Sequence, residues 1–122
     1  MTRTHAVLRG GGTALVLAGN QDGLPSVLHW GADLPDDAVS QLATAIGGPV
    51  PHNALDEPWR LTVLPTSGEG WLGTPGYAGH RAGAHAAPRW ASELDADADC
   101  HGATVTAVAD IGVEVVLRYR LD

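Results

Sequence analysis

The chain has 122 residues, and although 44% of them are hydrophobic, 19 residues are alanine, so the larger apolar side chains suffice for one modest core and exclude a second domain. Sixteen glycines and eight prolines exclude long helices. The net charge of −7, with seven Arg and no Lys, disfavours nucleic acid and anionic membrane surfaces as partners, because both are bound mainly by basic side chains.

Nothing in the sequence directs the chain to a membrane or out of the cell. No apolar run approaches the roughly 18 residues that a spanning helix needs. Arg3 and Arg9 are followed by apolar runs shorter than the core of a signal peptide. Cys100 is the single cysteine and has no partner for an internal disulfide. We therefore expect a soluble, cytoplasmic protein.

The first part of the chain predicts three strands and one helix. Short β-prone runs at 4–9 and 13–18 flank three glycines, and a further run spans 26–30. Residues 35–46 carry apolar positions at helical spacing, with Asp33 placed to cap the helix and Gly47 placed to stop it. The residues expected on the apolar face are Leu34, Ala38, Leu42, Ala45 and Ile46.

The second part predicts a loop, a strand, an irregular segment and a hairpin. Prolines make 47–58 a loop, and alternation predicts a strand over 59–64. Residues 65–89 are too rich in glycine and proline for regular structure, but Trp71 and Tyr77 within them suit packing anchors. Runs at 102–109 and 113–121 flank a turn and predict a β-hairpin. The fold class is therefore an all-β, antiparallel β-sandwich with one short accessory helix around 35–46, in a single domain over 1–122.

Candidate metal and nucleotide sites lack the patterns that such chemistry requires. Asp95, Asp97 and Asp99 imitate the start of a calcium loop, but its required glycine and final glutamate are missing. A possible zinc cluster has the wrong ligand spacing; its members are His80, His85, Cys100 and His101. The glycines at 68, 70 and 73 match a dinucleotide fingerprint but no helix can follow them. We expect no metal, no cofactor and no catalytic constellation.

Aromatic side chains near glycine-rich or proline-rich loops leave carbohydrate binding open. An aromatic face packs on sugar C–H groups while neighbouring polar side chains accept or donate to hydroxyls. The competing interpretation is core packing, because the chain has no Phe and its tryptophans must fill part of the core. The aromatic residues concerned are Trp30, Trp59, Trp71, Tyr77 and Trp90.

Three segments give the sequence a family resemblance. They read LPSVLHWGADL (24–34), PVPHNALDEP (49–58) and LPTSGEGWLGTPGYAGHR (64–81). Together they resemble the start of bacterial α-galactosidases of glycoside hydrolase family 36, over most of residues 5–121 and most specifically over 70–81. In that family the N-terminal region is a large β-sandwich that precedes a catalytic (β/α) barrel. The resemblance implies that this chain is part of a larger supersandwich and is incomplete as a domain.

The catalytic part of the family has no counterpart here. Its nucleophile and general acid/base are aspartates at the ends of barrel strands, and no Asp in this chain matches those motifs. The resemblance therefore implies a non-catalytic domain or fragment of a retaining glycosidase. The parent enzyme would hydrolyse terminal α-galactosides, and the domain would support homo-oligomer formation and the rim of the active site.

A loop of the family's N-terminal sandwich approaches the active site of a neighbouring subunit. By order along the chain this loop corresponds to 47–58, so the resemblance implies that His52, Asn53 and Asp56 are substrate-binding candidates. Asp56 is the first choice because one carboxylate can accept hydrogen bonds from two hydroxyls. The alternative function is a free-standing β-sandwich module that binds carbohydrate or a protein partner.

Overall fold

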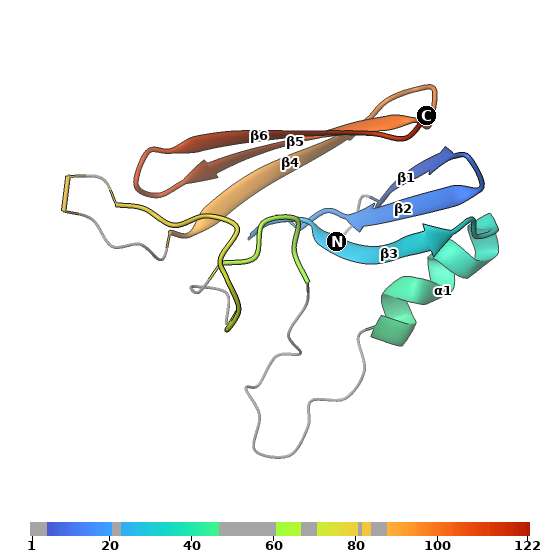
Figure 1. The fold of residues 1–122 in the computed structure, drawn as a ribbon, viewed down its shortest axis with the longest axis horizontal. Helices are drawn as coiled ribbons and strands as arrows, with labels where there is room; N and C mark the ends of the chain where they lie inside the picture. Colours follow the sequence, from blue (N-terminus) through green and yellow to red (C-terminus); the bar gives the residue numbers. More distant parts are fainter. Residues whose placement is uncertain (1–4, 21–22, 47–60, 67–70, 81, 84–87) are drawn as a thin grey trace, which may run out of the picture.

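The chain is mostly β-structure, as its sequence predicts. The computed structural model describes residues 5–20, 23–46, 61–66, 71–80, 82–83 and 88–122. Within them are two three-stranded antiparallel sheets and one short helix, arranged as an all-β, sandwich-like fold. In Figure 1 the sheet of β1–β3 lies between the sheet of β4–β6 and the helix α1.

The first sheet consists of β1 (His5–Gly10), β2 (Thr13–Ala18) and β3 (Ser26–Ala32), in that order. Gly11 and Gly12 join β1 to β2 with φ of 55° and 76°. Positive φ at both central residues defines the type I′ turn, whose twist matches that of the paired strands, and glycine adopts it without strain. The three glycines that the sequence offers therefore set the register of the first hairpin.

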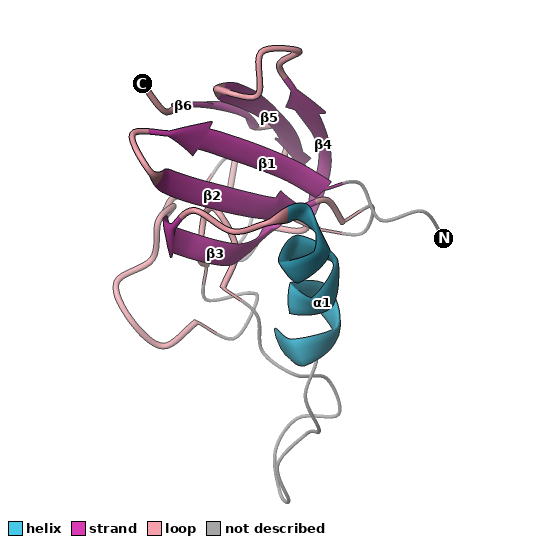
Figure 2. Cartoon of the chain, turned by 90° about the vertical axis from the view of Figure 1, so that its right-hand side faces the viewer, coloured by secondary structure: helices cyan, strands magenta, loops and turns pink. Residues whose placement is uncertain are grey.

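Helix α1 (Asp36–Ile46) covers the outer face of this sheet (Figure 2). It begins after Pro35, whose carbonyl accepts a hydrogen bond from the N–H of Val39 at 3.2 Å, and acidic Asp36 and Asp37 in its first turn suit the positive end of the helix dipole. Asp33 does not cap the helix, so that expectation was wrong. It lies too far before the first turn, and its carboxylate accepts from the N–H of Leu34 instead.

The buried face of α1 differs from the predicted stripe. Val39, which the stripe omitted, is buried and packs on the sheet together with Leu34 and Leu42. Ala45 is exposed, contrary to expectation. Val39 and Ala45 lie on opposite sides of Leu42 around the helix. The face of α1 that contacts the sheet is therefore turned toward Val39 and away from Ala45.

The second sheet consists of β4 (Trp90–Ala96), β5 (Gly102–Ala109) and β6 (Glu114–Arg120). The predicted hairpin is confirmed as β5 and β6, with a three-residue turn that ends on Gly112 at φ 80°. Strand β4 was not predicted. Its sequence, WASELDA, has no β-branched residue, and its strand conformation comes from pairing with β5 along its whole length.

Strand β6 alternates as its sequence predicts. Val115, Leu117 and Tyr119 are half-buried, whereas Glu114, Val116, Arg118 and Arg120 between them are exposed. Tyr119 and the following Leu121 pack against the buried residues of the first sheet. One face of β6 therefore belongs to the interior and the other to solvent.

Buried side chains form three clusters, two on the inner face of the second sheet and one beneath α1. Between the sheets lie Ala6, Leu8, Leu15, Leu17 and Ala103. Between the first sheet and α1 lie Val16, Ala18, Leu28 and Val39. On the same face of the second sheet as Ala103 lie Leu24, Trp90, Ala107 and Ala109, with side chains from the loop residues Val63, Leu64 and Tyr77 packed against them. The first sheet is therefore covered on both faces.

The strand predicted over 59–64 is reduced to one bridge in its described part. Thr62 pairs with Ser26, and the N–H groups of Val27 and Val63 donate to the carbonyls of Leu61 and Pro25. Pro25 has no N–H and cannot extend this ladder, which explains its shortness. Residues 59 and 60 lie outside the described residues.

The glycine-rich loop is irregular, as predicted, and its two aromatic anchors act differently. Tyr77 packs edge-on against Trp90, with ring centroids 5.6 Å apart and an interplanar angle of 88°. Trp71 is half-buried over its own turn, where its Nε1 donates to the carbonyl of Thr74 at 2.8 Å. A side chain at Gly73 would clash with the Trp71 ring, so this position of the ring requires glycine at residue 73.

Membrane insertion by a helix is not supported by the described part of the chain. Helix α1 has 11 residues, and no helix among the described residues is long and apolar enough to cross a bilayer.

Candidate functional site

The substrate-binding residues expected from the resemblance lie outside the described residues. These are His52, Asn53 and Asp56, and their positions stay a prediction. The described residues on either side of 47–60 belong to α1 and to a segment that is bonded to β3. On one side α1 ends at Ile46, and on the other side Leu61 is bonded to β3 through the N–H of Val27 at 2.7 Å.

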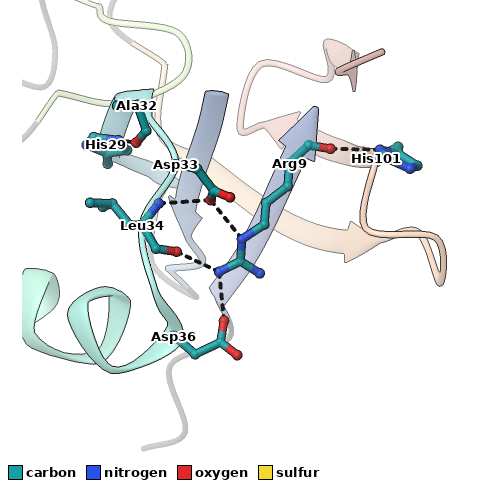
Figure 3. Close-up of polar contacts among 7 residues, drawn as sticks. All are labelled: Arg9, His29, Ala32, Asp33, Leu34, Asp36 and His101. Carbon is teal, nitrogen blue, oxygen red and sulfur yellow. Dashed lines mark hydrogen bonds and ion pairs between the residues drawn. The ribbon is translucent and has the colours of Figure 1, made fainter. Parts of the chain in front are cut away.

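The most extensive polar cluster among the described residues is centred on Arg9, near the end of β1 (Figure 3). Its Nε donates to Asp33 Oδ1 at 3.0 Å, and its Nη2 donates to Asp36 Oδ1 at 2.7 Å. The same Nη2 donates to the carbonyl of Leu34 at 2.9 Å. Arg9 therefore fastens the segment that leaves β3 and the first turn of α1 to the end of β1.

The backbone of Arg9 is bonded to the opposite sheet. Its N–H donates to the carbonyl of Cys100 at 2.9 Å, and its carbonyl lies 2.7 Å from Nδ1 of His101. Because a carbonyl can only accept, Nδ1 of His101 carries the proton in this contact. His101 in turn accepts at its own carbonyl from the N–H of Leu121 at 2.8 Å. One residue thus connects both sheets and the helix.

Close backbone packing completes this end of the sandwich. A Cβ at Gly10 would lie 3.0 Å from backbone atoms of Leu121 and Asp122, so the last residues of the chain approach the first hairpin at a position where a larger residue would crowd them. Cys100, at φ 61°, is exposed in the turn between β4 and β5. This turn and the end of β6 are therefore both held against the first hairpin.

The electrostatics of the Arg9 cluster are those of a structural ion pair. The hydrogen bond that Arg9 donates to Asp36, and after it the one that Arg9 donates to Asp33, raise the pKa of the Arg9 guanidinium above its ordinary value. The side chain of Asp36 is 90% exposed and that of Asp33 is 49% exposed. Both carboxylates accept hydrogen bonds from the same guanidinium, so the cluster joins the end of β1 to the segment that leads into α1.

A shallow hollow of about 560 Å³ lies beside this cluster. It is lined by Arg9, Asp33, Leu34, Pro35 and Asp36. Its charged groups are already paired with one another, and it has one aliphatic side chain and one proline but no aromatic side chain. A sugar would find no stacking platform there, so the hollow is a junction between elements rather than a built pocket.

Trp30 is the exposed aromatic residue of the described strands, with 63% of its surface accessible. It is paired with Leu15, which is paired with Leu8, so it lies on the face of the first sheet that meets the second sheet. Arg9 pairs with Ala14 and lies on the other face. Trp30 and the Arg9 hollow are therefore separate surfaces.

The residues considered for metal binding are not gathered in the described part of the chain. Among the described residues no group of three or more His, Cys, Asp or Glu side chains could hold an ion. Asp99 instead accepts from the N–H of His101 at 2.9 Å and lies 3.8 Å from Arg120. His85 lies outside the described residues.

Sequence reasoning missed the Arg9 junction. The available signal was a lone arginine in an apolar strand, together with two aspartates that flank Leu34-Pro35 ahead of a helix. Opposite charges beside secondary-structure ends are common, so only the fold shows which pair meets.

A scan against known protein families finds no matching family, and searches among curated proteins and among solved structures find no match.

Proposed function

We propose that this chain is a non-catalytic β-sandwich module of an α-galactosidase-like enzyme. In this role it supports assembly of a homo-oligomer and forms part of the rim of the parent enzyme's active site. The sequence resemblance over 24–34, 49–58 and 64–81 carries the identity of the enzyme. The observation that carries the module's role is the all-β, sandwich-like fold, since an N-terminal β-sandwich is what the resemblance implies.

The charged residues support a non-catalytic role. A retaining glycosidase needs two carboxyl groups roughly 5 Å apart, one of them protonated, on either side of the scissile bond. Asp33 and Asp36 both accept hydrogen bonds from the guanidinium of Arg9. Their geometry suits holding α1 against the first sheet.

The first test is activity of the purified chain on a chromogenic α-galactoside such as p-nitrophenyl α-galactopyranoside. We expect no turnover above the enzyme-free rate. Turnover that survives replacement of Asp33 and Asp36 by Asn would overturn the non-catalytic role, and turnover lost on that replacement would move catalysis to the Arg9 cluster.

The second test is the reading frame that follows codon 122 in the gene. A frame that continues into a barrel with two acidic residues at strand ends supports the proposal.

In that enzyme, Asp56→Asn should raise KM for the galactoside with little change in kcat, because a rim residue binds ground state and transition state alike. Asp37→Asn, on the exposed first turn of α1, is the matched control and should change neither constant.

A second candidate function is a free-standing carbohydrate-binding module, and the exposure of Trp30 favours it. A gene without a downstream barrel would replace the first proposal by this one. Titration with galactose and melibiose, followed by tryptophan fluorescence, would then give a shift that Trp30→Ala abolishes. Leu72→Ala is the control, since Leu72 is 99% exposed and apolar but has no ring face for stacking.

A further inference from the structure

Strand β6 is an edge strand with an uninterrupted backbone. It is the last strand in the order β4-β5-β6, and no described residue pairs with its other side (Figure 1). Its ladder with β5 runs without a bulge from the pair Gly102–Arg120 to the pair Val108–Glu114. The strand contains no Pro and no bulge, two features that commonly protect an exposed edge from pairing.

The backbone groups that face this open edge can be identified. The carbonyl of Val113 accepts from the N–H of Ala109 at 2.8 Å, and the N–H of Leu121 donates to the carbonyl of His101 at 2.8 Å. Residues of an antiparallel strand bond alternately to one neighbour and to the other, so the odd-numbered residues of β6 bond β5. The residues whose N–H and C=O groups point away from β5 are Glu114, Val116, Arg118 and Arg120.

The edge is complementary to itself in a register centred on Leu117. If two copies pair antiparallel about a two-fold axis at Leu117, Glu114 lies opposite the partner's Arg120, and Arg120 lies opposite the partner's Glu114. Val116 then lies opposite the partner's Arg118, and no like charges meet within β6. An axis at Arg118 would instead place two arginines face to face and Glu114 opposite the partner's Asp122.

The inner face of β6 favours the same pairing. In this register Val115 lies opposite the partner's Tyr119, and Leu117 lies beside its own copy. All three side chains are only half-buried in the single chain, so a second copy would cover apolar surface that the sandwich leaves partly open. A two-fold pairing is also closed at this strand, because it uses the β6 edge of both copies.

We propose that two copies of this chain associate through β6, antiparallel about Leu117, so that their second sheets join into one continuous sheet. The inference deepens the proposed function and rests on the part of it that concerns self-association. It uses only residues of β6 and is independent of the sugar site.

The backbone test is Val116→Pro, measured by sedimentation equilibrium of the full chain over a range of concentrations. The substitution removes a donor that points to the partner and leaves the bonds to β5, so the dimer should weaken by about tenfold or more, because the change acts twice across the axis. Val116→Thr keeps the donor and the β-branched shape and should stay within about threefold of the wild type. Circular dichroism verifies that both variants fold.

The charge test decides the register, even if Val116→Pro does not fold. Glu114→Arg alone and Arg120→Glu alone each place like charges opposite one another and should weaken the dimer by roughly tenfold at low salt. The double swap restores opposite charges and should recover most of the wild-type affinity. With the axis at Val116, where Glu114 faces the partner's Arg118, the double swap would fail to recover it.

The outcomes separate this inference from the rest of the proposed function. A dimer that is insensitive to Val116→Pro and to the charge variants would overturn the β6 interface and leave self-association standing. A chain that stays monomeric at high concentration, or that grows beyond a dimer without limit, would overturn the two-fold pairing. The reading frame and the sugar titrations decide the remainder independently.

Discussion

Strands β2 and β6 have different patterns of apolar residues because their two sheets are covered differently. Strand β2, TALVLA, is buried on both faces over most of its length, because the second sheet covers one face and α1 covers the other. Strand β6, EVVLRYR, alternates between half-buried and exposed residues because only one face is covered. A continuous apolar run therefore marks a middle layer, and alternation marks an outer layer.

The largest expected effect compares two leucines, one in each strand. Leu17→Ala, at a position with no exposed surface, should lower the free energy of unfolding by about 2–5 kcal/mol, the usual result of emptying a filled core site. Leu117→Ala, at a half-buried position, should lower it by roughly half as much. Urea unfolding at a protein concentration low enough to keep the chain monomeric measures both. Equal losses would contradict the difference in coverage.

A sharper comparison replaces valine by threonine on the two outer faces. Val16 is fully buried beneath α1, so Val16→Thr buries a hydroxyl and should cost about 1–3 kcal/mol. Val116 is 42% exposed, so Val116→Thr should stay within about 0.5 kcal/mol of the wild type. The same unfolding experiment applies. A loss at position 116 as large as that at position 16 would mean that the outer face of the second sheet is covered in solution.

Alkaline pH tests how deeply the inner face of β6 is buried. Burial raises the pKa of the Tyr119 phenol above its ordinary value of 10.0. The folded chain then holds this proton more tightly than the unfolded chain, so the stability from this group is complete below pH 10 and is lost as pH rises through the folded-state pKa. Tyr119→Phe should lose less stability than the wild type between pH 8 and pH 11. Parallel losses in the two proteins would place the phenol in solvent.

The smallest effect concerns the attachment of α1 to the first sheet. Arg9→Met keeps an apolar stem but removes the bonds to Asp33, Leu34 and Asp36. These ion pairs are largely exposed, so we expect a modest loss of stability that shrinks as salt is added. Hydrogen exchange should quicken in α1 more than in β5. Uniform quickening across both sheets would show that Arg9 acts through the core instead.

Much of the fold could be predicted because its strands carry local signals. The glycine turn between 9 and 13, the apolar run of β2 and the alternation of β6 each depend on nearby residues alone. Strand β4 gave no such signal, because its conformation is imposed by β5, and the segment after Trp59 formed one bridge because Pro25 ends the ladder. Long-range pairing is what single-sequence reasoning lacks.

The candidate site was less accessible to sequence reasoning. His52, Asn53 and Asp56 came from the family resemblance and lie outside the described residues. The Arg9 junction came from the fold, since residue 9, residues 33 and 36, and residue 101 lie in distant parts of the sequence and meet only when the end of β1, the start of α1 and the turn between β4 and β5 pack together. Charge partners of this kind depend on tertiary arrangement, and neither periodicity nor spacing reveals them.

The order of strands in each sheet has a consequence for how the chain folds. Both sheets are meanders, β1-β2-β3 and β4-β5-β6, so every strand pairs with a neighbour along the sequence. Each half can therefore collapse from short-range hairpins, which form within microseconds, before the slower docking of one half on the other. The transition state should then contain two formed meanders, while the contacts between the two sheets are still unformed. Destabilising substitutions between the two sheets should therefore accelerate unfolding, whereas destabilising substitutions within the turns should slow folding.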